Sequence, residues 1–384
     1  MAILACAKIG GSFEKMGMRV GAVFTTITMI VLSLLLGPVA AIPRTAATTF
    51  ELGVLPILPG ASHAWVSVAY FAVVLFFVLR PTKIVDMIGK ILTPFLLLSL
   101  LSLIVMGMVS PIGIPAATSV ENAFATAFSE GYNTMDALAG VIMAAIPLAA
   151  VSAKGYKDPA EKSKVLVFSG MISSAGLAII YGGMMFLGSQ TSGLDLEGLS
   201  RIQLVIRIVT DIFGPGGVFI LSFLTTLACL STAIVLMIIS SDFFTKIFKN
   251  RVPYPVVALV LTAISYFISL LNVDQIISLV SPALYIIYPM IIVLVACVLL
   301  GLDKKHGFAL KTSVYFTLGF SVISVTGAWL DLGLVSRVMA RLPFHESGFD
   351  WVLPAILVFM AAVLITPRKQ AGGQPLSRLQ PQKP

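Results

Sequence analysis

Ten apolar runs, each long enough to cross a lipid bilayer, dominate this chain of 384 residues. About twenty apolar residues span the hydrocarbon core as an α-helix, and open strands are excluded there because their unpaired backbone groups are costly. We therefore expect an all-α, polytopic membrane fold with a partial helix at the N-terminal end. The predicted spans are residues 20–42, 64–80, 91–109, 133–151, 165–189, 217–241, 254–271, 276–300, 311–332 and 351–366.

The composition supports a membrane protein and argues against a nucleic-acid partner. Hydrophobic residues make up 58% of the chain and charged residues 11%, whereas soluble domains carry about 25% charged residues. The net charge of +8 would suit nucleic acid, but the basic residues lie in short segments between the spans and not on one face. The partner that this pattern indicates is the lipid bilayer.

The positions of the basic residues predict the orientation in the membrane. Of the 25 Lys and Arg residues, all but five fall in alternate gaps between the spans or in the C-terminal tail. Cytoplasmic loops retain Lys and Arg, so we expect both termini to be cytoplasmic. We expect one transmembrane domain over residues 1–369 and a disordered cytoplasmic tail over residues 370–384, which is rich in Gly, Pro and Gln. The five residues on the other side are Arg44, Arg201, Arg207, Arg337 and Arg341.

Two spans contain residues that interrupt helices. Gly37 and Pro38 fall within the first span, followed by Pro43, and Gly131 begins a polar stretch at the start of the fourth. Proline removes a backbone donor and glycine weakens the helix, so main-chain groups become available to a ligand. Broken helices indicate a transporter site. For the prolines of the first span, a simple packing kink is an equally good interpretation.

Three segments resemble the branched-chain amino acid carriers of bacteria: GPVAAIPRTAATTFE (37–51), EGYNTMDALAGVI (130–142) and TTLACLSTAI (225–234). The resemblance implies sodium-coupled symport of leucine, isoleucine and valine across the inner membrane. It also implies a fold of twelve helices with a five-plus-five inverted repeat, in which the broken first and sixth helices hold substrate and ion. Residues 130–151 match the sixth helix, and the chain is expected to begin inside the second. The alternative is a transport-inactive remnant or scaffold.

The substrate site is expected at the interruption in the sixth helix. A zwitterionic amino acid needs donors for its carboxylate, acceptors for its ammonium and an apolar pocket, and broken helix ends supply the first two. The candidates are Tyr132, Asn133, Thr134 and Asp136. An acid within a span is often functional, but Asp136 could also cap the helix that follows the break.

A sodium site follows from the resemblance alone. The matching positions are the carbonyl of Ala228 and the hydroxyls of Ser231 and Thr232. Such hydroxyls also commonly bond to a carbonyl of the preceding turn, which is the alternative interpretation. Sodium is expected as the coupling ion, and no other cofactor is expected.

The remaining polar residues indicate no enzyme. The acidic residues are scattered, and the three histidines lie in separate loops, so neither forms the cluster that metal-assisted catalysis requires. Asn272 and Asp274 are expected to cap the helix over 276–300. Tyr285 and Tyr288 in that helix either line the pathway or pack. The histidines are His63, His306 and His345.

Overall fold

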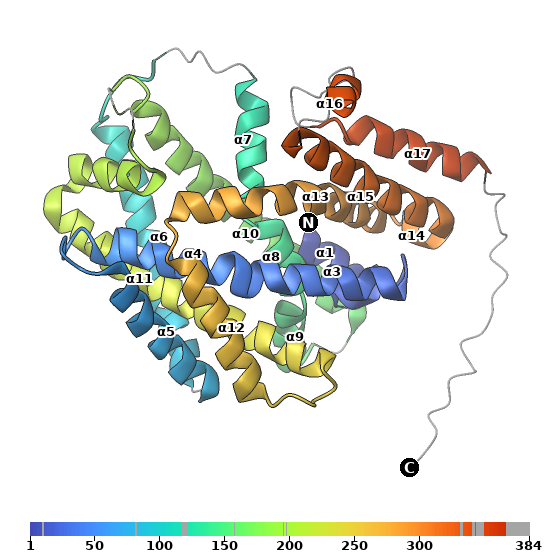
Figure 1. The fold of residues 1–384 in the computed structure, drawn as a ribbon, viewed down its shortest axis with the longest axis horizontal. Coiled ribbons are helices and arrows are strands. Elements are labelled where there is room, and N and C mark those ends of the chain that lie inside the picture. The colour runs from blue at the N-terminus through green and yellow to red at the C-terminus, as the bar shows by residue number, and fades with distance from the viewer. Residues whose placement is uncertain are drawn as a thin grey trace.

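The computed structural model describes residues 1–9, 11–80, 83–116, 122–156, 158–194, 196, 198–330, 333–339, 342 and 349–365. All regular secondary structure in these ranges is helical (Figure 1). The predicted disordered tail, residues 370–384, lies outside the described residues.

The helices follow one another as α1 (Ala2–Ile9), α2 (Phe13–Gly17), α3 (Ala22–Leu34), η1 (Leu35–Val39), α4 (Ala41–Thr48), η2 (Thr49–Val54), α5 (His63–Leu79), α6 (Lys83–Val109), α7 (Ala123–Tyr132), α8 (Asp136–Ile142), α9 (Ala145–Ala153), α10 (Pro159–Gln190), α11 (Arg201–Ile247), α12 (Tyr254–Ser269), α13 (Val273–Leu299), α14 (Leu302–Lys305), α15 (Gly307–Trp329), α16 (Gly333–Met339) and α17 (Val352–Ile365). The two η elements are wider, π-helical turns.

The ten predicted spans all fall on apolar helices. Among the described residues, five helical segments are long and apolar enough to cross a membrane, and the bent pair Ala123–Ile142 and Ala145–Ala153 makes a sixth. Shorter apolar helices, at His63–Leu79, Thr93–Val109, Tyr254–Ser269 and Val352–Ile365, match the other four predicted spans. The all-α, polytopic fold is therefore confirmed, while the inverted repeat stays a prediction.

The span predicted over 217–241 corresponds to the second part of α11, while the helical part before it was not predicted. Helix α11 begins sixteen residues earlier, at Arg201, because Ser200 and Gln203 form a capping box. The Gln203 N–H donates to Ser200 Oγ at 3.2 Å, and the Ser200 N–H donates to Gln203 Oε1 at 2.9 Å. This reciprocal pairing satisfies amides at the helix start. Gly214 has non-helical φ and ψ, so α11 consists of two helices joined at a kink beside Pro215, and the predicted span begins just after this kink.

The first predicted span, 20–42, was too short. The helical chain runs on to Val54 through the bend at Gly37, whose backbone leaves the helical region at φ −96° and ψ −120°. Proline can be tolerated inside a membrane helix because neighbouring helices satisfy the freed backbone groups. Here Ser265 Oγ of α12 donates to the Leu261 carbonyl of its own helix at 2.9 Å and lies 3.5 Å from the Pro38 carbonyl, which it contacts as a second, weaker acceptor.

The core forms around the first span. Helices α3 and α4 pack with α11, α12 and α13, and side chains such as Leu32, Ile42, Met237 and Leu284 are fully buried there. A smaller buried cluster joins α6, α10 and α11. Apolar contact within these clusters is what places the two interrupted spans next to each other.

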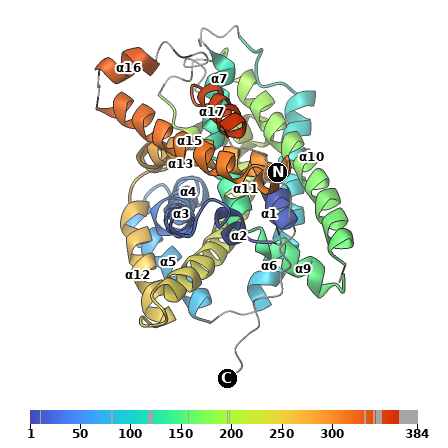
Figure 2. The ribbon, with the colours of Figure 1, turned by 90° about the vertical axis from the view of Figure 1, so that its right-hand side faces the viewer.

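Outer helices flank this core. Helix α15 packs against α13 of the core, and α17 packs against α15 (orange to red in Figure 1). Helix α10 lies at an edge in Figure 2, and only 6% of the residues in its most apolar stretch are buried. Such a helix offers its apolar surface to lipid, as expected for a membrane protein.

The bend in α11 provides a test of the fold. Gly214 has φ 66° and ψ −166°, a region that only glycine adopts readily, so G214A should lower the stability by about 1–3 kcal/mol. G216A is the matched control, because a Cβ at either position meets no atom within 4 Å and only Gly214 has a positive φ. Thermal unfolding in detergent measures both, and equal midpoints would contradict the prediction.

Candidate functional site

The span that matches the sixth helix breaks at residues 133–135. Helix α7 ends at Tyr132 and α8 begins at Asp136, and Met135 between them adopts the left-handed conformation with φ 58°. The Thr134 N–H donates to the Gly131 carbonyl at 3.3 Å, and the Met135 N–H to the Tyr132 carbonyl at 3.1 Å. These short turns replace the helical ladder. The predicted interruption is therefore present in the structure.

Asn133 joins the break to two other helices. Its carbonyl accepts a hydrogen bond from Arg44 Nη1 of α4 at 2.6 Å. Its side-chain Nδ2 donates to Glu130 Oε2 at 2.9 Å, and its Oδ1 accepts from Ser281 Oγ of α13 at 3.0 Å. Asn133 is only 7% exposed. Its polar groups therefore fix the position of the break between the first interrupted span and α13.

A charged cluster lies beside Asn133. Arg201 at the start of α11 binds both carboxylate oxygens of Glu130, at 2.7 and 3.0 Å. Its Nε also lies 3.1 Å from Asp274 Oδ1 at the start of α13. The side chains are roughly half exposed, at 52% for Arg201, 44% for Glu130 and 40% for Asp274. One guanidinium thus links α7, α11 and α13.

The cap of α13 was predicted only in part. Asn272 does cap the helix, since its Oδ1 accepts from the Gln275 N–H at 2.8 Å and its own N–H donates to Gln275 Oε1 at 3.0 Å. Asp274 does not share in this cap and instead pairs with Arg201. The prediction for Asp274 was wrong because its partner is far away in the sequence and visible only in the fold.

Aromatic rings form a wall next to the break. Tyr132 stacks on Tyr288 with 4.4 Å between ring centroids and meets the edge of Tyr285 at 6.0 Å. Tyr132 and Tyr288 are 5% and 4% exposed, and Tyr285 is 37% exposed. Both α13 tyrosines therefore pack against Tyr132, and the part of Tyr285 that stays exposed leaves room for a role in the pathway.

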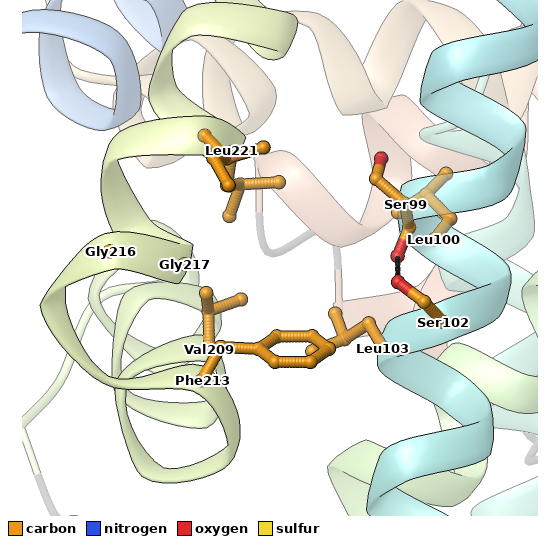
Figure 3. Close-up of a pocket in the computed structure, with 10 residues that line it drawn as sticks. Ser99, Leu100, Ser102, Leu103, Val209, Phe213, Gly216, Gly217 and Leu221 are labelled. Atoms are coloured by element: carbon orange, nitrogen blue, oxygen red, sulfur yellow. Dashed lines mark hydrogen bonds between the residues drawn. The ribbon is translucent and has the colours of Figure 1, made fainter.

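A wider cavity than those beside the break lies between α6 and the kink of α11 (Figure 3). Its volume is about 350 Å³, and its walls are mainly apolar. The two serine hydroxyls donate within their own helix, Ser99 to Leu96 at 2.9 Å and Ser102 to Ser99 at 2.8 Å. The cavity therefore lacks a charged side chain that could pair with an ammonium or a carboxylate. Its lining is Ser99, Leu100, Ser102, Leu103, Val209, Phe213, Gly216, Gly217, Ile220 and Leu221.

Comparison with known proteins identifies the family. The sequence pattern of the branched-chain amino acid transport protein family matches residues 1–369. This chain belongs to that family. It is 32% identical to the branched-chain amino acid transport system 2 carrier protein of Pseudomonas aeruginosa over 376 aligned residues. The aligned region covers 95% of this chain and 84% of the relative. It is 30% identical over 383 residues to a candidate branched-chain amino acid carrier protein of Staphylococcus haemolyticus, covering 93% and 85%.

Membership of the branched-chain amino acid transport protein family confirms two predictions from the sequence. The recognised segments identified the correct family, and that family consists of transporters and not enzymes. Since this member is a transporter, the polar break inside its apolar body is the natural place to look for a solute site.

Thr134 and Asp136 are the accessible polar side chains of the break in this family member. Both are exposed. The Thr134 hydroxyl donates to the Gly131 carbonyl at 2.8 Å, and Asp136 Oδ2 accepts from the Tyr181 hydroxyl of α10 at 2.7 Å. Asp136 is the first residue of α8, where a negative charge is favoured by the helix dipole. Its role in binding substrate stays a prediction.

The proposed sodium ligands lie on one stretch of α11. Ser231 Oγ donates to the Ala228 carbonyl at 2.9 Å, which is the local bonding named above as the alternative. Ala228 lies inside α11, where its carbonyl also accepts the helical hydrogen bond of the residue four positions on, so both of its lone pairs are engaged. The Thr232 side chain is exposed. The assignment of these three residues to sodium stays a prediction.

The first interruption serves packing. Gly37 lies against α11 so closely that an added Cβ would be 2.5 Å from Ser240 Oγ. Gly37 and Pro38 are buried, and Ser265 donates to the Pro38 carbonyl. These contacts fit the packing-kink interpretation. The contact of this span with the break comes about two turns later, where Arg44 reaches Asn133.

Sequence reasoning missed Arg44, Glu130 and Arg201 as members of the site. Arg44 had been placed in a gap because the predicted first span ended at residue 42, whereas the helical segment runs on to Val54 and contains it. Glu130 directly precedes the break and lies in a recognised segment. Arg201 had been placed in a loop, so its contact with Glu130 could come only from the tertiary structure.

Proposed function

We propose that this chain is a sodium-coupled symporter that carries leucine, isoleucine and valine into the cell. It acts as a single transporter domain over residues 1–369 in the bacterial inner membrane, with both termini cytoplasmic. Family membership supports the class of solute. The observation that carries the proposal is the break at residues 133–135, where polar groups interrupt an apolar body and are held by Arg44 and Ser281.

The residues of the break take different roles in this proposal. Asp136, held by Tyr181, accepts the ammonium of the amino acid, and Thr134 lies beside it. The Tyr132 ring forms part of the apolar wall. Asn133 has its amide committed to Glu130 and Ser281, so it orients the break. Selectivity within the class is loose, because one methylene in an apolar pocket is worth about 1–3 kcal/mol.

Sodium coupling supplies the driving force. One sodium ion that enters with a neutral amino acid releases about 2.3 kcal/mol per 100 mV of membrane potential. A tenfold sodium gradient adds about 1.4 kcal/mol. Together these sustain accumulation by a factor of several hundred.

Uptake measurements test the proposal. The full chain, reconstituted into vesicles, should accumulate labelled leucine only when sodium is present outside, and unlabelled valine and isoleucine should compete. Alanine should compete more weakly, since it fills less of an apolar pocket. Leucine uptake that is equal in sodium and in choline would overturn the coupling, and a lack of any uptake would support an inactive remnant.

A substitution at Thr232 tests the ion site. T232A removes one proposed oxygen ligand, so the sodium concentration for half-maximal leucine uptake should rise by roughly tenfold, the loss of about 1.4 kcal/mol of binding. T210A is the control, because Thr210 is also exposed on α11 and donates only to its own helix, to the Ile206 carbonyl at 2.7 Å. An unchanged sodium requirement in T232A would remove this residue from the site.

A further inference from the structure

A second cavity, with several polar side chains in its wall, lies next to the break. Its volume is about 190 Å³, enough for about six water molecules at roughly 30 Å³ each or for one small solute. It is lined by the end of α7, by α13 and α15, and by the residues just before α17, and it is open on one side. It shares no lining residue with the cavity of Figure 3. The polar and aromatic residues of its wall are Tyr132, Tyr285, Ser321, Ser324, Asp350 and Trp351.

Three polar atoms of this wall are buried without a hydrogen-bond partner among the described residues. They are the Tyr132 hydroxyl, Ser321 Oγ and Trp351 Nε1, and their residues are 5%, 4% and 8% exposed. The Tyr132 hydroxyl and Trp351 Nε1 lie near each other but do not form a bond of normal geometry. Buried polar groups are nearly always satisfied. Three such groups from three separate elements around one cavity point to a bound polar solute.

The chemistry of the wall suits an amino acid. Asp350, 8% exposed, provides a carboxylate that Ser324 Oγ holds at 3.0 Å. The rings of Tyr132, Tyr285 and Trp351 add faces that attract a cation. An ammonium group would pair with this side of the cavity. Trp351 Nε1 and the Ser321 hydroxyl can donate to a carboxylate, since indole N–H is a donor only and a hydroxyl can do either.

We propose that this cavity binds a second molecule of the transported class of amino acid, beside the transport site. This inference rests on the proposed function. Pro289, Val325 and Ala328 supply the apolar surface for the side chain of the solute. Tyr132 belongs to both the cavity and the break. An amino acid bound in the cavity therefore holds the Tyr132 ring against Tyr288, and so it favours one position of the break.

Leucine binding to the purified full-length chain in detergent tests this proposal. Equilibrium dialysis with labelled leucine in sodium should give two molecules per chain, and W351F should reduce the ratio to one. Leucine should change the tryptophan fluorescence of the wild type and not that of W351F. W329F is the matched control, because Trp329 on α15 is 70% exposed and does not line the cavity; it should keep both signals.

Ser321 separates ligand binding from folding. S321A should weaken the second leucine by roughly tenfold while the unfolding midpoint of the ligand-free protein stays the same or rises, because the hydroxyl lacks a partner in the ligand-free structure. If the wild type binds one leucine per chain and neither variant changes this ratio, the cavity holds only water and the proposal is overturned. Leucine uptake would then still support the transport function. If the wild type binds one leucine per chain and W351F binds none, this cavity is the transport site itself and the proposal of a second site is overturned. A ratio of zero without any uptake would refute both proposals.

Discussion

R44M is expected to reduce leucine uptake by roughly ten- to hundredfold, the effect of losing a charged hydrogen bond worth about 1.5–3 kcal/mol. Arg44 Nη1 donates to the Asn133 carbonyl at 2.6 Å and so ties the first interrupted span to the second. Methionine keeps much of the side-chain volume but cannot donate. The buried carbonyl is then left unpaired, and the break loses its attachment to α4. Initial rates in reconstituted vesicles measure the effect.

The lysine variant is the matched control for this position. R44K keeps a positive charge and one donor group, so it should retain more uptake than R44M, although a single ammonium does not reproduce the guanidinium geometry. Thermal unfolding of both variants should show a folded protein, which separates loss of transport from loss of fold. Uptake by R44M within twofold of the wild type would contradict the assigned role.

R201Q should impair transport several-fold with little loss of stability. The guanidinium joins Glu130 before the break to Asp274 at the start of α13. Each exposed ion pair contributes only about 0.2–1 kcal/mol, so unfolding changes little. The pairs connect three helices, however, and their removal leaves two carboxylates of like charge near each other. We expect the region outside the break to open more readily, and reagent access to a cysteine placed at Thr134 would report this opening.

Arg207 provides the control within the same helix. It pairs with Asp211 at 2.8 Å, one turn further along α11, and links no second helix. R207Q should therefore leave uptake and cysteine access unchanged. Choline chloride raises the ionic strength at fixed sodium, and salt screens exposed ion pairs. It should therefore lower leucine uptake by the wild type toward the level of R201Q. Equal uptake by R201Q and R207Q would exclude a role for the cluster.

The interruption of the sixth-helix segment was predictable because it depends on local chemistry. Gly131 and the polar residues after it are poor helix formers in an apolar span, and the structure breaks at 133–135. The contacts of Asn133 were not predictable. The fold surrounds it with Arg44, Glu130 and Ser281, which come from three different helices, while its binding of substrate stays a prediction.

The sequence by itself determined the all-α membrane fold, the approximate spans and the family, because runs of apolar residues and short motifs are properties of neighbouring positions. Tertiary structure alone decided that Arg44 reaches Asn133, that Asp274 pairs with Arg201, and that Tyr132, Ser321 and Trp351 meet around one cavity. Those contacts join residues far apart in the chain. They form only where packing of apolar helices brings a donor within reach of an acceptor.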